Sequence, residues 1–176
     1  MNNYQQPERE FSETVVQINR ISKKTKGGNQ IRFGSLVVLG DKKGKVGMGI
    51  SKAQDVRNAI RKAIEDAKKN MVTITMQGTT IPCSVNVKLG ASKVLLKPAP
   101  PGSGIIAGGP MRVVLESSGL RDVVGKTLGS NSKIGNVRAT ILALQKASLL
   151  KEKKDYQKAS SKEQKKGNKQ QLAAAQ

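Results

Sequence analysis

Apolar residues gather in three stretches near the N-terminal end of the chain and predict three strands. Residues 13–21 and 31–41 are rich in β-branched and aliphatic side chains, and residues 45–50 repeat this pattern over a shorter length. The polar segment 22–30 carries three lysines and two adjacent glycines, so it predicts a loop. Residues 41–44 predict a tight turn. Strands with such short connections are expected to pair as an antiparallel meander.

The pattern changes to a helical one after the third strand. Apolar residues recur at helical spacing from Val56 to Ala67, which predicts a helix with one apolar stripe facing the sheet. Ser51 or Asp55 is the candidate N-terminal cap. The basic side chains on the rest of this helix are either an ordinary solvated face or phosphate contacts. They are Arg57, Arg61, Lys62, Lys68 and Lys69.

A second set of apolar segments follows. Residues 71–77, 81–90 and 92–99 predict strands, and the alternation is clearest in the middle one. Cys83 falls in that middle segment and is expected to be a small core residue. Prolines end this group of strands, and residues 100–110 form a glycine-rich connector.

Two further helices are predicted beyond the connector. Pro110 suits the first turn of a helix over 111–118, and the glycine that follows would end it. Residues 120–129 fit either a strand or a short helix. Asn131 or Ser132 is expected to cap a last helix that runs to about residue 149. Its buried face would carry Val137, Ile141 and Leu144.

The composition divides the chain into four segments. Residues 1–10 predict a flexible lead, and residues 11–75 a domain of three antiparallel strands and one helix. Residues 76–150 predict an α/β domain, so the fold class is α+β and the boundary falls within 70–77. Only Leu172 among all Leu, Ile, Val and Phe residues lies beyond position 150. The last segment, 151–176, is therefore expected to be a basic, disordered tail.

Several classes of function are excluded by what the 176 residues lack. There is no histidine, which removes the imidazole base of Ser-His and Cys-His enzymes and any His-ligated metal. One cysteine cannot form an internal disulfide or a Cys-based zinc site. No apolar run approaches the length of a membrane span, and the N-terminal residues do not resemble a signal peptide. We therefore expect a cytosolic protein without cofactor or metal.

The charge predicts a polyanionic partner. Lys plus Arg number 32 against 12 Asp plus Glu, a net charge of +20, and the excess is spread evenly along the chain. An anionic membrane would be met by one basic amphipathic helix with aromatic anchors, which this distribution does not favour. The four aromatic residues are too few for a base-stacking platform. Contact with the backbone and shape of folded RNA is therefore the leading hypothesis.

Two short motifs resemble nucleotide-binding loops but do not complete them. Residues 45–52, KVGMGISK, begin like a dinucleotide fingerprint, but the third glycine is replaced by Lys52 and the preceding strands form a meander. Gly47 and Gly49 instead predict a bulge or a close backbone approach, with RNA as one candidate for that approach. Residues 125–127, GKT, lack the leading glycine of a phosphate-binding loop at the required position.

Two other segments are stronger candidates for binding. The loop around Gly27 and Gly28 carries Arg20, Lys23, Lys24 and Lys26, which suits insertion between phosphates, although a solvated loop is the alternative. The glycine-rich residues 102–109 are either a flexible connector or a contact with phosphate or a protein, with Arg112 beside them.

Four blocks of sequence together carry a family resemblance. Residues 19–28 (NRISKKTKGG), 45–56 (KVGMGISKAQDV), 102–119 (GSGIIAGGPMRVVLESSG) and 136–144 (NVRATILAL) are similar to bacterial small-subunit ribosomal protein number five, and the likeness extends over residues 10–150. The resemblance implies a first domain like a double-stranded-RNA-binding domain. It also implies a second α/β sandwich domain whose sheet has two helices on one face.

The resemblance also implies a function and a set of contacts. The family binds small-subunit rRNA where the head of the subunit joins its body, near the spectinomycin site and the messenger RNA path, and it affects assembly, head movement and translational accuracy. Its neighbours include small-subunit ribosomal proteins number four and number eight. The rRNA-binding residues expected here are Arg20, Ser22, Lys23, Lys24, Thr25, Lys26, Gly27, Gly28, Lys52, Arg57 and Arg61. The expected protein interface comprises Gly102, Gly104, Gly108, Gly109 and Arg112.

Two other classes of function are alternatives to this one. A free RNA chaperone or duplex-RNA regulator would share the low aromatic content but would be found largely off the ribosome. An enzyme of phosphoryl transfer is the third class, and the incomplete GKT segment argues against it.

Overall fold

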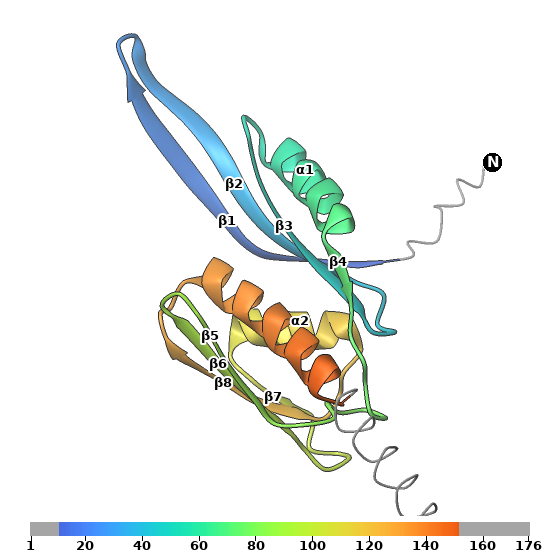
Figure 1. The fold of residues 1–176 in the computed structure, drawn as a ribbon. Helices are drawn as coiled ribbons and strands as arrows, with labels where there is room; N and C mark the ends of the chain where they lie inside the picture. Colours follow the sequence, from blue (N-terminus) through green and yellow to red (C-terminus); the bar gives the residue numbers. More distant parts are fainter. Residues whose placement is uncertain (1–10, 152–176) are drawn as a thin grey trace, which may run out of the picture.

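The computed structural model describes residues 11–151, which form two packed α/β units (Figure 1). The first unit has an antiparallel sheet in the order β1-β2-β3-β4, and α1 (Val56–Lys69) lies over one face. The predicted meander, its turn at 41–44 and the helix are thus confirmed. The strands are β1 (Ser12–Thr25), β2 (Gly28–Gly40), β3 (Lys45–Ala53) and β4 (Met71–Thr73).

β1 and β2 continue much farther than the sequence pattern predicted. Residues 22–30 were expected to be a loop, but strand pairing continues to Thr25 opposite Gly28, which leaves only Lys26 and Gly27 in the turn. The prediction was wrong because this end of the hairpin is exposed on both faces and so has no apolar pattern to reveal it. β4 is likewise shorter than predicted, and it pairs with β3 in the first sheet.

α1 approaches the first sheet very closely because both surfaces are made of small residues. Ala59, Ala63 and Ala67 of the helix are fully buried. A Cβ atom at Gly49 of β3 would overlap the carbonyl oxygen of Ala63, and one at Gly47 would overlap that of Ala67. The backbone approach predicted at these two glycines is therefore made by α1. RNA cannot occupy that position, and this expectation was wrong.

The N-terminal cap of α1 is Asp55, one of the two predicted candidates. Its backbone is extended, and its carboxylate accepts a hydrogen bond from the Asn58 amide at 3.2 Å rather than from the helix backbone. Ser51, the other candidate, lies within β3.

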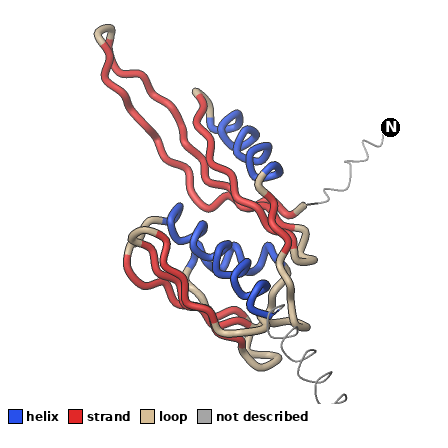
Figure 2. Tube along the Cα trace, viewed as in Figure 1, coloured by secondary structure: helices blue, strands red, loops and turns tan. Residues whose placement is uncertain are grey.

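The second unit is a mixed sheet with both of its helices on one face, as predicted (Figure 2). The strand order is β5-β6-β8-β7, and only β7 is parallel to its neighbour. Residues 120–129, which fitted two structures, contain strand β8. The elements are β5 (Val85–Leu89), β6 (Ser92–Pro98), β7 (Ile105–Ile106), α2 (Gly109–Ser118), β8 (Val123–Gly129) and a helix over residues 133–151.

The ends of the two helices follow the predicted signals. Pro110 lies in the first turn of α2, and Gly119 ends it in the left-handed conformation, with φ of +90°. The helix over 133–151 is capped by Ser132, whose Oγ accepts a hydrogen bond from the Gly135 N–H at 3.4 Å and whose carbonyl accepts one from Asn136 at 2.9 Å. Between the two candidates, Ser132 is the cap and Asn131 precedes it.

One hydrophobic core spans both units. Leu36, Val38 and Val46 on the first sheet are buried in the same cluster as Met111 and Leu144 of the second unit. Alternate residues of β2 face α1 instead, so the first sheet is buried on both faces over this stretch. This double burial explains why residues 36–39 are a continuous apolar run, LVVL, instead of an alternating one.

The predicted core role of Cys83 is confirmed. Its side chain is buried in the shared core, and its Sγ lies 3.7 Å from the carbonyl oxygen of Ala147. The predictions for the flexible lead, 1–10, and for most of the basic tail, 151–176, fall outside the described residues.

Candidate nucleic-acid interface

The most prominent feature of the first unit is a two-stranded arm. β3 pairs with β2 only from Phe33 to Gly40, so residues 21–32 extend beyond the sheet as a hairpin without a third strand. Figure 1 shows this hairpin, hereafter the arm, projecting past α1 at the far end of the molecule from the second unit. The tip of the arm is exposed on both faces and so has no core packing to support it. Its structure is held by backbone hydrogen bonds between the two strands.

The arm and its base carry a dense set of cations. The sequence from position 14 to position 40 contains no acidic residue. α1 covers one face of the sheet, and strand alternation places Arg20, Ser22 and Lys24 on the continuation of that face along the arm. Lys23 and Arg32 lie on the opposite face of the arm. Cations on both faces of a thin hairpin suit a position between two phosphate backbones.

The two glycines at the tip of the arm differ in whether their backbone conformation requires glycine. Gly28 has φ of +125°, a conformation that side chains rarely adopt, and its carbonyl accepts a hydrogen bond from the Thr25 hydroxyl at 2.8 Å. Gly27 has an ordinary φ, and a Cβ atom there would meet nothing within 4 Å. The fold of the free protein therefore needs glycine at position 28 but not at position 27.

The other predicted RNA-binding residues lie below the arm on opposite sides of the sheet. Lys52 of β3 is exposed beside Gly34, on the face turned away from α1. Arg57 and Arg61 lie one helical turn apart on the exposed side of α1. The structure therefore brings the arm cations together into one hairpin but separates Lys52 from the two arginines. Lys26 stands at the tip of the arm, within the turn.

The glycine-rich connector is ordered by a carboxylate that no local sequence pattern indicates. Oδ1 of the buried Asp122 accepts hydrogen bonds from the backbone N–H groups of Gly102 at 3.0 Å and Gly104 at 3.1 Å. The Thr79 side chain is the main hydrogen-bonding partner that lowers the pKa of Asp122, and the backbone N–H of Gly104 is the next. The segment then forms the short strand β7, so it is not a flexible connector.

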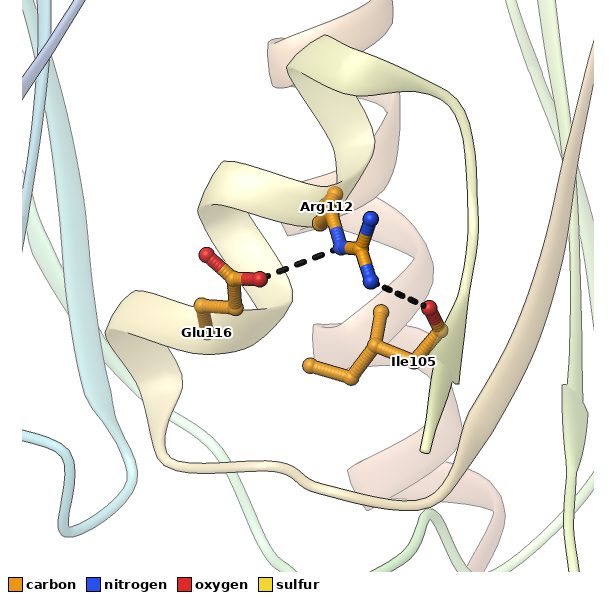
Figure 3. Close-up of polar contacts among 3 residues, drawn as sticks. All are labelled: Ile105, Arg112 and Glu116. Atoms are coloured by element: carbon orange, nitrogen blue, oxygen red, sulfur yellow. Dashed lines mark hydrogen bonds and ion pairs between the residues drawn. The ribbon is translucent and has the colours of Figure 1, made fainter. Parts of the chain in front are cut away.

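Arg112 is held by its own unit. Its Nε lies 3.1 Å from a carboxylate oxygen of Glu116, one turn farther along α2, and its guanidinium donates a hydrogen bond to the carbonyl oxygen of Ile105 at 3.2 Å (Figure 3). About half of its side chain is exposed, and its guanidinium spans from α2 to β7. Gly108 caps α2 and Gly109 begins it, and both are exposed. The five predicted interface residues therefore lie in one continuous segment.

A polar groove of about 590 Å³ lies where the two units meet. Lys42, Arg112 and Arg121 line it, with Glu116 as its one acidic residue. The backbone N–H groups of Lys42 and Gly44 donate to the carbonyl oxygens of Ser117 and Ser118, which joins the β2–β3 turn to the end of α2. The units therefore meet through backbone hydrogen bonds as well as through the shared core.

Residues 11–151 contain no group of three or more Cys, Asp or Glu residues placed to hold a metal ion. Within the same residues, no helix is long and apolar enough to span a membrane.

Two packed α/β units with a projecting cationic arm have the shape and charge expected of a structural protein that binds RNA. Comparison with family models agrees with this class. Residues 11–75 match ribosomal protein S5, N-terminal domain, and residues 87–157 match ribosomal protein S5, C-terminal domain. Together the matches cover most of the chain, and the chain belongs to the ribosomal protein S5 family. It is a ribosomal protein that binds RNA in the small subunit and serves in translation.

Proposed function

We propose that this protein binds small-subunit rRNA at the junction of head and body, with the arm as its main contact. The observation that carries the proposal is the projection of the arm, with its cations on both faces and no acidic residue from position 14 to position 40. The arm would neutralise phosphates on two sides and so couple the mobile head to the body. This position adjoins the spectinomycin site and the messenger RNA path.

The rest of the proposal concerns the residues around the arm. Lys52 would contact rRNA on one side of the sheet, and Arg57 and Arg61 on the other. The proposed domains are residues 11–75 and 76–150. The protein would act on the ribosome, in the cytoplasm. It would have no enzymatic activity and bind no nucleotide cofactor.

The glycine-rich segment is the proposed interface with neighbouring ribosomal proteins. Gly102 and Gly104 would be presented by Asp122, and Gly108, Gly109 and Arg112 by the start of α2. The proposed neighbours are small-subunit ribosomal proteins number four and number eight. A loop that is already fixed loses little conformational freedom on binding, which supports a protein interface here. The stability of this interface would affect assembly and translational accuracy.

Sedimentation of a cell lysate through sucrose gradients tests the proposal first. We expect stoichiometric migration with the small subunit at moderate salt and after a high-salt wash. A protein that stays at the top of the gradient at both salt concentrations would contradict the ribosomal assignment and favour a free RNA-binding protein. Spectinomycin sensitivity of a strain with Gly27→Ala tests the placement of the arm. Unchanged sensitivity in a viable strain with normal subunits would contradict that placement.

A further inference from the structure

The second sheet has one face that neither of its helices covers. α2 and the helix over 133–151 both lie on the side that looks toward the first unit (Figures 1 and 2). The residues of the other side are fixed by the strand register, in which Lys126 stands opposite Leu95, Val124 opposite Lys97, and Leu128 opposite Lys93. We call this side the outer face. It comprises Asn86, Lys88, Lys93, Leu95, Lys97, Ile106, Val124, Lys126 and Leu128.

The outer face carries four exposed lysines and no acidic residue. The sequence has no Asp or Glu from position 67 to 115 or from 123 to 151. Between residues 76 and 151, the carboxylates are those of Glu116 and Asp122. Glu116 pairs with Arg112, and Asp122 is buried against the glycine-rich segment. Neither carboxylate belongs to the outer face, so the unit itself does not neutralise these lysines there.

Two of the lysines stand directly opposite each other. Lys88 of β5 and Lys93 of β6 are register partners on adjacent strands, and both are exposed. Like charges in this position repel and disfavour the sheet. An anion bound between them would remove the repulsion, so this pair is an independent indication that the outer face meets negative charge.

Aliphatic residues run between the lysines as a diagonal stripe. Leu95 has Val124 and Leu128 as its diagonal neighbours across the strand pair, and Ile106 lies opposite Val124. The exposed fractions of Val124, Leu128 and Ile106 are 36%, 43% and 59%. These aliphatic side chains are uncharged and shorter than lysine. A sugar–phosphate backbone can therefore lie across them while the longer lysines reach its phosphates.

We propose that the outer face is a second RNA-binding surface, which contacts the sugar–phosphate backbone of a folded RNA segment. The inference rests on the proposed function, since it assigns a further contact to the same rRNA. Lysine acts as a point charge toward phosphate, whereas protein interfaces are depleted in lysine and favour aromatic residues and arginine, both absent from this face. The arm and the outer face lie at opposite ends of the molecule, so the protein bridges two RNA segments (Figure 1).

Directed cleavage of rRNA tests this placement in assembled subunits. A cleavage reagent is attached to cysteine in Lys126→Cys and, separately, in Lys24→Cys. The native Cys83 is buried, and unsubstituted protein treated alike gives the background. We expect cleavage from both positions, in different rRNA segments. Cleavage from position 24 alone would overturn the outer face but leave the proposed function intact, whereas cleavage from neither would overturn both.

Binding to isolated small-subunit rRNA at several salt concentrations gives a second test. In Lys88→Gln/Lys93→Gln we expect the slope of log affinity against log salt to fall by about 1.5, because two phosphate contacts are lost. The matched control Lys133→Gln/Lys146→Gln removes two exposed lysines of the helix over 133–151, off the outer face, and should keep the wild-type slope. If Lys88→Gln/Lys93→Gln keeps wild-type affinity and slope while Val124→Ser/Leu128→Ser impairs incorporation into subunits, the outer face binds a protein and the inference is wrong.

Discussion

Oδ1 of Asp122 accepts a hydrogen bond from the backbone N–H of Gly104 at 3.1 Å, across 18 residues of sequence. This contact fixes the glycine-rich segment, so its removal should loosen that segment. We expect amide hydrogen exchange at Gly102 and Gly104 to be faster by about tenfold or more in Asp122→Ala, because hydrogen bonds to charged acceptors are strong. Asp122→Asn should be intermediate. Exchange measured by NMR checks this, and unchanged rates in Asp122→Ala would contradict it.

The same carboxylate predicts a dependence of stability on acid. Its hydrogen bonds, led by that from the Thr79 side chain, lower the pKa of Asp122 in the folded state. The resulting stabilisation is complete above the ordinary aspartate pKa of about 3.9 and is lost as the pH falls through the depressed value. The difference in unfolding free energy between wild type and Asp122→Asn should therefore shrink below about pH 4. Urea unfolding at several pH values, followed by circular dichroism, measures it, and a constant difference would be the contrary result.

The two tip glycines should respond differently to the same substitution. Gly27→Ala should leave the unfolding free energy within about 0.5 kcal/mol of wild type, since the new methyl group meets nothing within 4 Å. Gly28→Ala should lose about 1 kcal/mol or more, because φ of +125° is unfavourable for alanine. Denaturation of both variants checks the stabilities. Any effect of Gly27→Ala on ribosome function would then arise from the contact made by the tip.

Neutralising the arm should weaken RNA binding without unfolding the protein. For Lys23→Gln/Lys24→Gln/Lys26→Gln, we expect the salt slope of rRNA affinity to fall by about 2, with an unchanged circular dichroism spectrum, because all three side chains are exposed. Lys43→Gln/Lys133→Gln/Lys146→Gln, which removes three exposed lysines outside the arm, serves as the matched control. An equal loss in the control variant would show that overall charge, and not the arm, determines affinity.

The junction between the units should be sensitive to a single methyl group. A Cβ atom at Gly40 would overlap the carbonyl oxygen of Ser117, so Gly40→Ala should destabilise the protein by about 1–3 kcal/mol. Gly109→Ala is the matched control, because a Cβ atom there meets nothing within 4 Å. Thermal unfolding compares the two. Equal melting temperatures for both variants would mean that the units do not pack through Gly40.

The sequence pattern predicted every large element, and its failures have physical reasons. Residues 22–30 looked like a loop because no side chain there is buried, and strand patterns depend on one buried face. β7 has only two residues, too few to show any alternation. The long-range hydrogen bond from the Gly102 N–H to Asp122 corresponds to no pattern in either local segment. The pair formed by Arg112 and Glu116 has helical i, i+4 spacing, so the sequence could have revealed this missed contact.

The shared core has a consequence for the order in which the chain folds during its synthesis. Leu36, Val38 and Val46 have their apolar partners among residues such as Met111 and Leu144, which leave the translating ribosome much later. α1 can cover its own face of the first sheet early, but the opposite face must wait for the second unit. Until then a nascent chain displays an uncovered apolar sheet beside a strongly basic arm, so this period of synthesis is when a chaperone or an RNA partner would protect it most effectively.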